Sequence, residues 1–450
     1  MSIQSGASSA RPAGGGPHGA VGRVATVVGE TLASERISRT AAGRLPLGID
    51  DERELARSVI VRNLDALAGE HLAQGLNPLD EAEESALVDA VLAKVLGLGR
   101  IQPLLDNPHI TDIHIRGCAS TRLKMIDGRR IPALPVVDSD EELVDLVRLV
   151  ATRLGRSERR FDAANPELNL QLPDGSRLFA MMEVSSRPSV IIRKHRFELS
   201  ALPELEQRGL VDHSLRCFLS AAVKARRNII VCGGTGSGKT TMLRALLNEV
   251  PPDERIVTIE DAYELGLDRF ENLHPDYDML QSRPPNIEER GEVTMLDLTK
   301  MALRMDPDRV IVGEVRGAEA FPMLLAMSQG NNGSMCTMHA DSTRTVFPKL
   351  AAYVSMAETG LPVETVNLLV ATALHLVIHI EVIDNVRRVV SIREVVDADG
   401  ARIVSNEVFK PGLDGRAVPG YPLRDSTMAL LERHGFDASL LDKPDGWWVV

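Results

Sequence analysis

The sequence has few aromatic residues and no excess of basic ones. Aromatic residues make up 3% of the 450 residues, too few for the stacking platforms that hold single-stranded nucleic acid. The formal net charge is -12, and an acidic chain repels phosphate backbones. We therefore expect no direct contact with nucleic acid.

Cysteine, long apolar runs and an N-terminal leader are also scarce or missing. None of the four cysteines lies in a C-x-x-C pair, which disfavours a disulfide framework or a zinc site and fits a reducing compartment. No run of about 18 apolar residues is present, and the N-terminus lacks the basic-then-apolar pattern of a signal peptide. These absences predict a cytoplasmic protein that can still dock on a membrane through a partner.

The first half of the chain changes pattern twice. Residues 1–48 are rich in Gly, Ser, Ala and Pro, and this composition predicts a disordered segment. In residues 49–98 apolar side chains recur at helical spacing, which predicts a small helical bundle without chemistry. Residues 99–196 show strand-like alternation and turn dipeptides, which predict a small α+β domain with a mostly antiparallel sheet.

The second half has the pattern of an α/β domain. Residues 197–213 are predicted to be a linker with a short helix. Helices then alternate with short, fully apolar strands over residues 214–385, as in a parallel sheet covered on both faces. Residues 386–450 are predicted to form C-terminal hairpins and a tail helix.

A glycine-rich loop carries the strongest chemical signal. The apolar strand at 228–232 leads directly into the G-x-x-x-x-G-K-T pattern, and a helix is predicted from Lys239. Glycines let the backbone N–H groups converge on phosphates, and the helix N-terminus adds partial positive charge. Lys239 is expected to reach the β- and γ-phosphates, and the Thr240 hydroxyl to bind Mg²⁺. The residues predicted to bind ATP here are Gly233, Gly234, Thr235, Gly236, Ser237, Gly238, Lys239, Thr240 and Thr241.

Hydrolysis needs a carboxylate placed beside the phosphates. A second apolar strand, at 309–314, ends in Glu314, which can orient or deprotonate the attacking water if this strand runs beside the phosphate-loop strand. The alternative is an exposed glutamate at a strand end. The flanking Gly313 and Arg316 favour a crowded site.

Two more strands end in polar residues. Between these two strands in sequence, the strand at 255–259 precedes Glu260 and Asp261, which we expect to hold Mg²⁺-bound waters. The alternative is that Asp261 or Glu264 caps the next helix. A strand between the phosphate-loop and Glu314 strands distinguishes RecA-like motor ATPases from small GTPases. A fourth strand, at 334–338, ends in His339, which either senses the γ-phosphate or is structural.

Together these motifs resemble the secretion ATPase superfamily of type II and type IV systems, and most closely the CpaF-like ATPases of Tad (Flp) pilus assembly. The resemblance covers roughly residues 50–410. The segments that carry it are the phosphate loop, Leu172–Arg177, Ile191–Lys194, Arg255–Asp261, Arg283–Asn286, Gly313–Gly317 and Met338–Ala340.

The resemblance implies a homohexameric ring motor that binds ATP between a small N-terminal domain and a RecA-like C-terminal domain. It implies catalytic roles for Glu260, Glu314 and His339. Arg177 and Arg193 are expected to reach the phosphates when the cleft closes. Arg304 and Arg316 are candidates for a neighbouring subunit's arginine finger, or else structural ion pairs.

The sequence departs from the family pattern at two places. Asn331-Asn332 follows Gly330 where the family has Gly-His, which puts one phosphate-sensing contact in doubt. Glu288-Glu289 stands where the family favours Glu-Gly. Neither change touches the phosphate loop or Glu314.

Three functions are open at this point. The first is an ATP-hydrolysing motor for pilus assembly or protein secretion that acts on an inner-membrane platform protein. The second is a conjugation-type ATPase that moves DNA or effectors. The third is a regulator or scaffold that binds ATP and barely hydrolyses it, and Asn331 is its one support.

Overall fold

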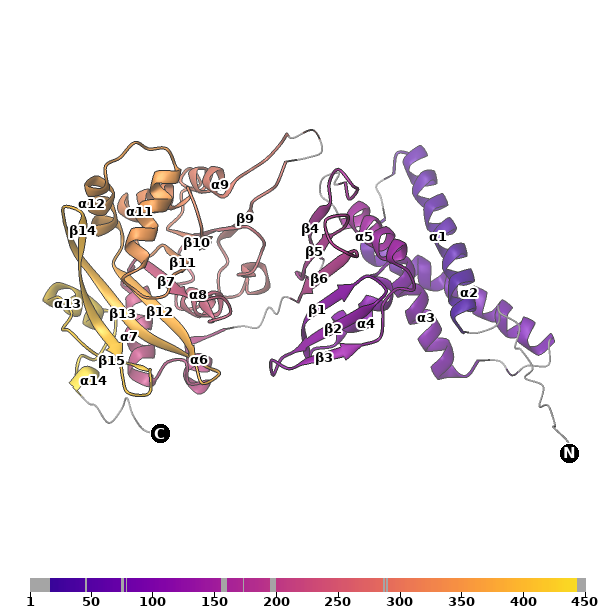
Figure 1. Cartoon of the computed structure of the whole chain (residues 1–450), viewed down its shortest axis with the longest axis horizontal. Helices are drawn as coiled ribbons and strands as arrows, with labels where there is room; N and C mark the ends of the chain where they lie inside the picture. Colours follow the sequence, from indigo (N-terminus) through magenta and orange to yellow (C-terminus); the bar gives the residue numbers. More distant parts are fainter. Residues whose placement is uncertain are drawn as a thin grey trace, which may run out of the picture. The chain divides into compact units, whose positions relative to one another are not determined.

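The computed structural model describes residues 17–44, 47–73, 77, 79–154, 160–172, 174–194, 200–285, 288 and 290–442. The chain divides into two compact units, Met1–His195 and Arg196–Val450 (Figure 1). No helix within the described ranges is long and apolar enough to cross a membrane.

The first unit begins with three helices: α1 (Pro17–Ala41), α2 (Ile49–Ala73) and α3 (Glu81–Val95). They share an apolar core that includes Val28, Ile60 and Val91. The side chain of Asp80 accepts the Glu83 N–H, and the Glu83 side chain accepts the Asp80 N–H, so a capping box fixes the start of α3.

The prediction of disorder for residues 1–48 is therefore wrong over residues 17–41. Val24, Val28 and Leu32 are spaced four residues apart and form a buried stripe on α1. The Gly, Ser and Ala content around them obscured this stripe. Residues 1–16 lie outside the described part of the chain.

The rest of the first unit is an antiparallel sheet with helices packed on it. Its strands have the order β3-β2-β1-β6-β5-β4. Buried residues of α5, among them Leu143 and Val147, share one core with Ile113 and Ile192 of the sheet. The predicted α+β fold with a preceding helical bundle is confirmed. The elements are η1 (Gly99–Ile101), α4 (Gln102–Asp106), β1 (Ile110–Arg116), β2 (Ser120–Met125), β3 (Arg130–Ala133), α5 (Asp140–Leu154), β4 (Glu167–Gln171), β5 (Arg177–Met181) and β6 (Ser189–Arg193).

The second unit is built on a sheet of nine strands in the order β15-β14-β13-β12-β7-β11-β10-β8-β9. The strands from β12 to β9 in this order run parallel, whereas β13, β14 and β15 continue the sheet antiparallel. The elements are α6 (Leu202–Gln207), α7 (His213–Lys224), β7 (Ile229–Gly233), α8 (Lys239–Leu247), β8 (Ile256–Glu260), η2 (Leu267–Arg269), β9 (Tyr277–Gln281), α9 (Met295–Ala302), β10 (Arg309–Val315), α10 (Ala320–Ser328), β11 (Met335–His339), α11 (Val346–Met356), α12 (Val363–Ala373), β12 (Leu376–Ile383), β13 (Val386–Asp399), β14 (Arg402–Pro411), β15 (Ala417–Pro419), α13 (Asp425–Arg433) and α14 (Ser439–Asp442).

Helices cover both faces of this sheet. Ile229 and Val231 of β7 face a core that includes residues of α7 and α8, while Ile230 and Cys232 face a second core with residues of α10, α11 and α12. Because both faces are buried, each central strand is apolar throughout rather than alternating. The predicted RecA-like α/β domain is confirmed.

A strand does lie between the phosphate-loop strand β7 and the Glu314 strand β10 in the sheet, but it is β11, and β8 lies on the far side of β10. The Glu314 strand therefore does not run directly beside β7, as the sequence argument for Glu314 supposed. One predicted boundary is also wrong. The predicted boundary at 385–386 falls in the turn of the β12–β13 hairpin, so the C-terminal hairpins belong to the same sheet. The predicted linker contributes to the core of the second unit, because Leu202 and Leu205 of its helix α6 are buried there.

Candidate nucleotide-binding site

The loop from Gly233 to Lys239 connects β7 to α8 at the carboxyl ends of the parallel strands. Gly236 and Gly238 have φ angles of 76° and 100°, which favour glycine. A Cβ on Gly233 would collide with the Ile380 carbonyl oxygen and lie 2.7 Å from the Ser237 Oγ. The curl of the loop therefore depends on its glycines.

The Lys239 ammonium group lies inside this curl. Its Nζ donates hydrogen bonds to the carbonyl oxygens of Gly233 (3.1 Å) and Gly234 (2.9 Å), and lies 3.4 Å from the Nδ1 of His339. Burial lowers the pKa of Lys239, although the negative charge of Glu314 opposes this effect. The lysine is held at the loop by backbone oxygens on one side and by His339 on the other.

Glu314 and His339 come together at the same edge. The His339 Nε2 lies 2.8 Å from the Glu314 Oε1. This contact does not align as a hydrogen bond, and the buried Oε1 has no hydrogen-bond partner in the described structure. The Thr337 hydroxyl donates to the Gly313 carbonyl (2.6 Å) and ties β11 to β10 just before both residues. The contacts thus link Lys239, His339 and Glu314 in one row.

Glu260 is the most deeply buried carboxyl group of the site, with 2% of its surface exposed. Its Oε1 accepts the backbone N–H groups of Glu264 (2.8 Å) and Leu265 (2.9 Å), and its Oε2 has no partner among the described residues. Burial raises the pKa of Glu260 to about 7. A Cβ on Gly313 would lie 3.2 Å from the Glu260 Cγ, so this glycine lets the two strands bring their acids together.

The segment after Glu260 reaches the phosphate loop without capping a helix. The Thr240 hydroxyl donates to the Glu264 Oε2 at 3.3 Å. Asp261 accepts hydrogen bonds from the Ser282 hydroxyl (2.7 Å) and from Arg316 (2.8 Å). The next element, η2, starts after Gly266 without a side-chain cap, which argues against the alternative role of Asp261 or Glu264 as a helix cap.

The predicted arginines divide into those that contact the site and those that do not. Arg316 donates to Asp261, and its Nε lies 3.7 Å from the Glu314 Oε2. Burial lowers the pKa of Arg316, but the hydrogen bond to Asp261 and nearby carboxylates outweigh this and raise it overall. Arg304 is exposed in the turn after α9, and no described contact joins it to the site.

Arg177 and Arg193 belong to the sheet of the first unit. They face each other as a register pair on β5 and β6, and the Arg193 Nε lies 3.2 Å from the Asp112 Oδ1. Their expected reach to the phosphates stays a prediction.

Asn331 has a different place from the one expected. Its amide donates to the Pro307 carbonyl, and its own carbonyl accepts the Ser334 hydroxyl (2.7 Å). These contacts lie at the amino ends of β10 and β11, whereas His339 lies at the carboxyl end of β11. This place gives no support to the doubt that Asn331 raised about a phosphate-sensing contact. The second departure, Glu288-Glu289, and the motif residue Asn286 fall partly or wholly outside the described residues.

Sequence reasoning missed Arg387 as a site residue. This residue of β13 donates from its Nε to the carbonyl oxygen of Gly236, at 3.0 Å. It lies 148 positions after Lys239 and in no motif, so the sequence offered only the Asp384-Asn385 turn as a signal that a hairpin tip was near.

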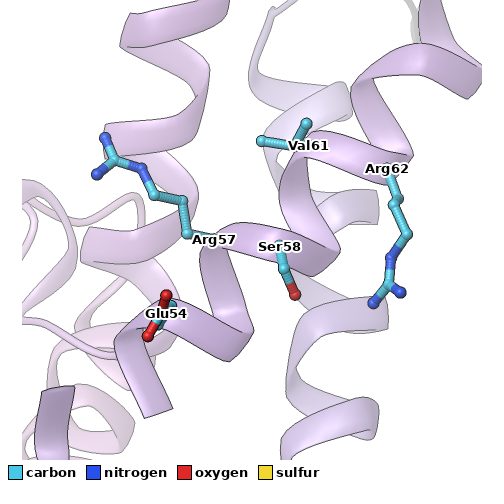
Figure 2. Close-up of a pocket in the computed structure, with 5 residues that line it drawn as sticks. All are labelled: Glu54, Arg57, Ser58, Val61 and Arg62. Carbon is cyan, nitrogen blue, oxygen red and sulfur yellow. The ribbon is translucent and has the colours of Figure 1, made fainter. Parts of the chain in front are cut away.

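One hollow lies away from this row of residues, and a second lies beside it. One is lined by Glu54, Arg57, Ser58, Val61 and Arg62, which all belong to α2. In Figure 2 the side chains of the two arginines extend away from each other, so the hollow lacks converging polar groups. The second adjoins the site, because Arg316 and Glu319 line it together with Thr294 and Met295 of the α9 start.

The chain is similar in sequence to several known proteins. A putative conjugal transfer protein of Mycobacterium tuberculosis is 34% identical over 311 residues, which cover 67% of the chain and 85% of that protein. The type IV secretion system protein VirB11 of Brucella suis is 30% identical over 308 residues, or 62% of the chain and 83% of that protein.

Solved structures include the VirB11 ATPase of Brucella suis in complex with sulphate, which is 27% identical, covers 65% of the chain and 94% of that structure, and has a TM-score of 0.35. The model of the family described as type II/IV secretion system protein matches residues 112–408, from β1 to β14. The chain therefore belongs to the type II/IV secretion system protein family.

Proposed function

We propose that the protein is an ATP-hydrolysing motor of a secretion or pilus-assembly system. The single observation that carries this proposal is the row of contacts from Lys239 through His339 to Glu314 at the carboxyl edge of the sheet. A lysine for the phosphates and a carboxylate for the attacking water are the two groups that phosphoryl transfer to water requires. Family membership and the secretion ATPases among the relatives support the same reading.

In this mechanism the loop N–H groups and Lys239 hold the triphosphate. Glu314 orients the attacking water and accepts its proton. His339, between Lys239 and Glu314, is placed to report whether the γ-phosphate is present.

The residues fit a Mg²⁺ ion bound with ATP. Mg²⁺ favours oxygen ligands, takes few of them from the protein, and keeps several waters. Thr240 would hold it directly, and Glu260 and Asp261 through waters; the unpartnered Oε2 of Glu260 is the observation that supports this. When bound, the ion supplies positive charge to the phosphate oxygens. No group of three or more potential metal-ligating side chains occurs within the described residues.

We also propose the finer identity of a Tad (Flp) pilus assembly ATPase that works as a homohexamer in the cytoplasm, docked on an inner-membrane platform protein. The motif resemblance supports it. A conjugal-transfer role is the second candidate, because the relative with 34% identity is named for that process. The third possibility, a regulator that barely hydrolyses ATP, rested on Asn331 alone, which lies at the end of β11 far from His339, so we do not favour it.

Two substitutions test the proposed hydrolysis. Lys239→Ala removes the charge inside the loop and is expected to abolish ATP binding. Glu314→Gln keeps the shape of the side chain but cannot accept the proton, so binding is expected to persist while turnover falls by about 100-fold or more. Phosphate release and binding of a fluorescent ATP analogue are measured on the full chain. Glu358→Gln, an exposed carboxyl at a turn after α11, is the matched control. Full turnover in Glu314→Gln would refute the role of Glu314.

A further inference from the structure

The tip of the β12–β13 hairpin lies beside the phosphate loop. Ile380 of β12 pairs with Gly233 at the end of β7. Beyond this pair β12 continues to Ile383, turns through Asp384 and Asn385, and returns as β13. The hairpin therefore extends beyond the carboxyl end of β7, where the phosphate loop begins, and places Arg387 beside the loop.

Arg387 makes two contacts with the crown of the loop, defined here as Gly234 to Gly238. Its Nε donates to the carbonyl oxygen of Gly236 at 3.0 Å. Its Cδ lies 3.0 Å from the point where a Cβ on Gly238 would be, so the aliphatic stem rests against that glycine. One side chain thus holds the two glycines with positive φ in the crown.

The hydrogen bond fixes the orientation of a peptide group that would otherwise be free to turn. Glycines at 236 and 238 impose little steric restriction on their own backbone angles. In a trans peptide the C=O and the next N–H point in opposite directions. When Arg387 holds the Gly236 carbonyl on the outside of the crown, the Ser237 N–H is directed inward. That N–H makes only a long contact, 3.4 Å, with the Gly234 carbonyl, and so remains available to a ligand.

We propose that Arg387 is a positioning residue for nucleotide binding, which orients the loop N–H groups toward the phosphates that ATP and ADP share. This inference rests on the proposed function. In this inference the C-terminal hairpin increases the affinity of the loop for nucleoside di- and triphosphates. Arg387 does so by holding the Gly236 carbonyl, and it does not contact the phosphates itself.

The test compares Arg387→Ala and Arg387→Lys with Arg388→Gln in the full-length protein. Arg388, the next residue on the strand, pairs with Asp414, so its substitution makes the same change of charge in the same hairpin without touching the loop. Dissociation constants for Mg·ADP and Mg·ATP, kcat, KM and the thermal midpoint without nucleotide are measured for each.

Arg387→Ala is expected to raise both dissociation constants by the same factor, about tenfold, which corresponds to about 1.4 kcal/mol. The kcat at saturating ATP and the thermal midpoint without nucleotide should stay near wild type. Arg387→Lys, which can still donate to the Gly236 carbonyl, should recover most of the affinity, and Arg388→Gln should bind like wild type.

An ADP dissociation constant within twofold of wild type in Arg387→Ala would overturn the inference, as would a loss confined to ATP. Failure of the wild-type protein itself to bind Mg·ATP would instead overturn the proposed function. The two failures are therefore distinguishable.

Discussion

At the scale of single residues, the two strand-end glutamates of the site differ in burial, and burial raises the pKa of Glu260. Glu260 is almost completely buried and has two N–H donors on one oxygen and none on the other. Glu314 lies closer to solvent and beside His339 and Arg316. Two carboxyl groups on neighbouring strands are thus placed in different environments, and burial raises the pKa of Glu260.

This difference predicts a pH-dependent stability. In the folded chain burial raises the pKa of Glu260 to about 7, whereas an unfolded glutamate titrates near pH 4.5. Between these values the folded state binds more protons than the unfolded state, so the contribution of Glu260 to stability falls as pH rises from about 4.5 to 7.

We expect Glu260→Gln to remove the loss of folding stability that accompanies rising pH. The amide oxygen can still accept both N–H bonds, and the side chain carries no charge at any pH. The variant should be more stable than wild type by up to about 3 kcal/mol at pH 8, and the gap should close near pH 5. Denaturant unfolding at both pH values, with EDTA and without nucleotide, measures it. A gap that does not change with pH would contradict the assignment.

At the scale of elements, the loop between β7 and α8 depends on the strand next to it. The carbonyl oxygen of Ile380 on β12 occupies the space that a side chain at Gly233 would need, and the Ser237 hydroxyl closes the other side. This makes Gly233 a packing requirement as well as a part of the motif.

We therefore expect Gly233→Ala to destabilise the second unit by about 2 kcal/mol, since the backbone of β12 cannot move aside cheaply. Nucleotide binding should fall with it. Gly234→Ala is the matched control for stability, because a Cβ on Gly234 would meet no atom within 4 Å. Urea unfolding followed by circular dichroism compares the two, and equal stability of the two variants would exclude the steric explanation.

The local parts of the site were predictable from the sequence, and the non-local parts were not. The strand, loop and helix around Lys239 follow from neighbouring residues, and so do the strand-end positions of Glu260, Glu314 and His339. The order of the strands does not, because pairing such as that of β7 with β11 and β12 depends on connections far along the chain.

The same limit explains the individual errors. Asn331 was judged from the family pattern, in which a histidine follows this glycine, but β11 runs between Asn331 and His339 and places them at opposite ends of the strand. Arg387 was missed because its contact with Gly236 exists only once the hairpin is folded against β7. Helix α1 was missed because composition was weighed above the spacing of its few large apolar residues.

At the scale of the whole molecule, the chain is made of two units with separate cores. In the first, α1 closes the helical bundle with a side chain, Val28, that is completely buried, whereas its neighbour Val27 is 41% exposed. The two valines offer a matched pair on one helix.

We expect Val28→Asp to open the bundle, because an unpaired carboxylate in an apolar core costs several kcal/mol or more. Hydrogen exchange in α1, α2 and α3 should speed up, while exchange in the nine-stranded sheet stays unchanged. Val27→Asp makes the same chemical change at the surface and should shift stability by less than about 0.5 kcal/mol. Faster exchange throughout both units would show that the bundle is not a separate core.

The sheet order also bears on how the protein is made. The strand that carries the phosphate loop, β7, has β11 and β12 as its two neighbours, and both are synthesised after it, with β12 ending at Ile383. Every strand partner in the first unit lies between Ile110 and Arg193, so that sheet can close while the rest of the chain is still on the ribosome. The strand that carries the phosphate loop can pair with β11 first, but it lacks its second neighbour until β12 has emerged. A ribosome stalled before Leu376 would therefore hold a chain with a finished first sheet and an unfinished nucleotide site.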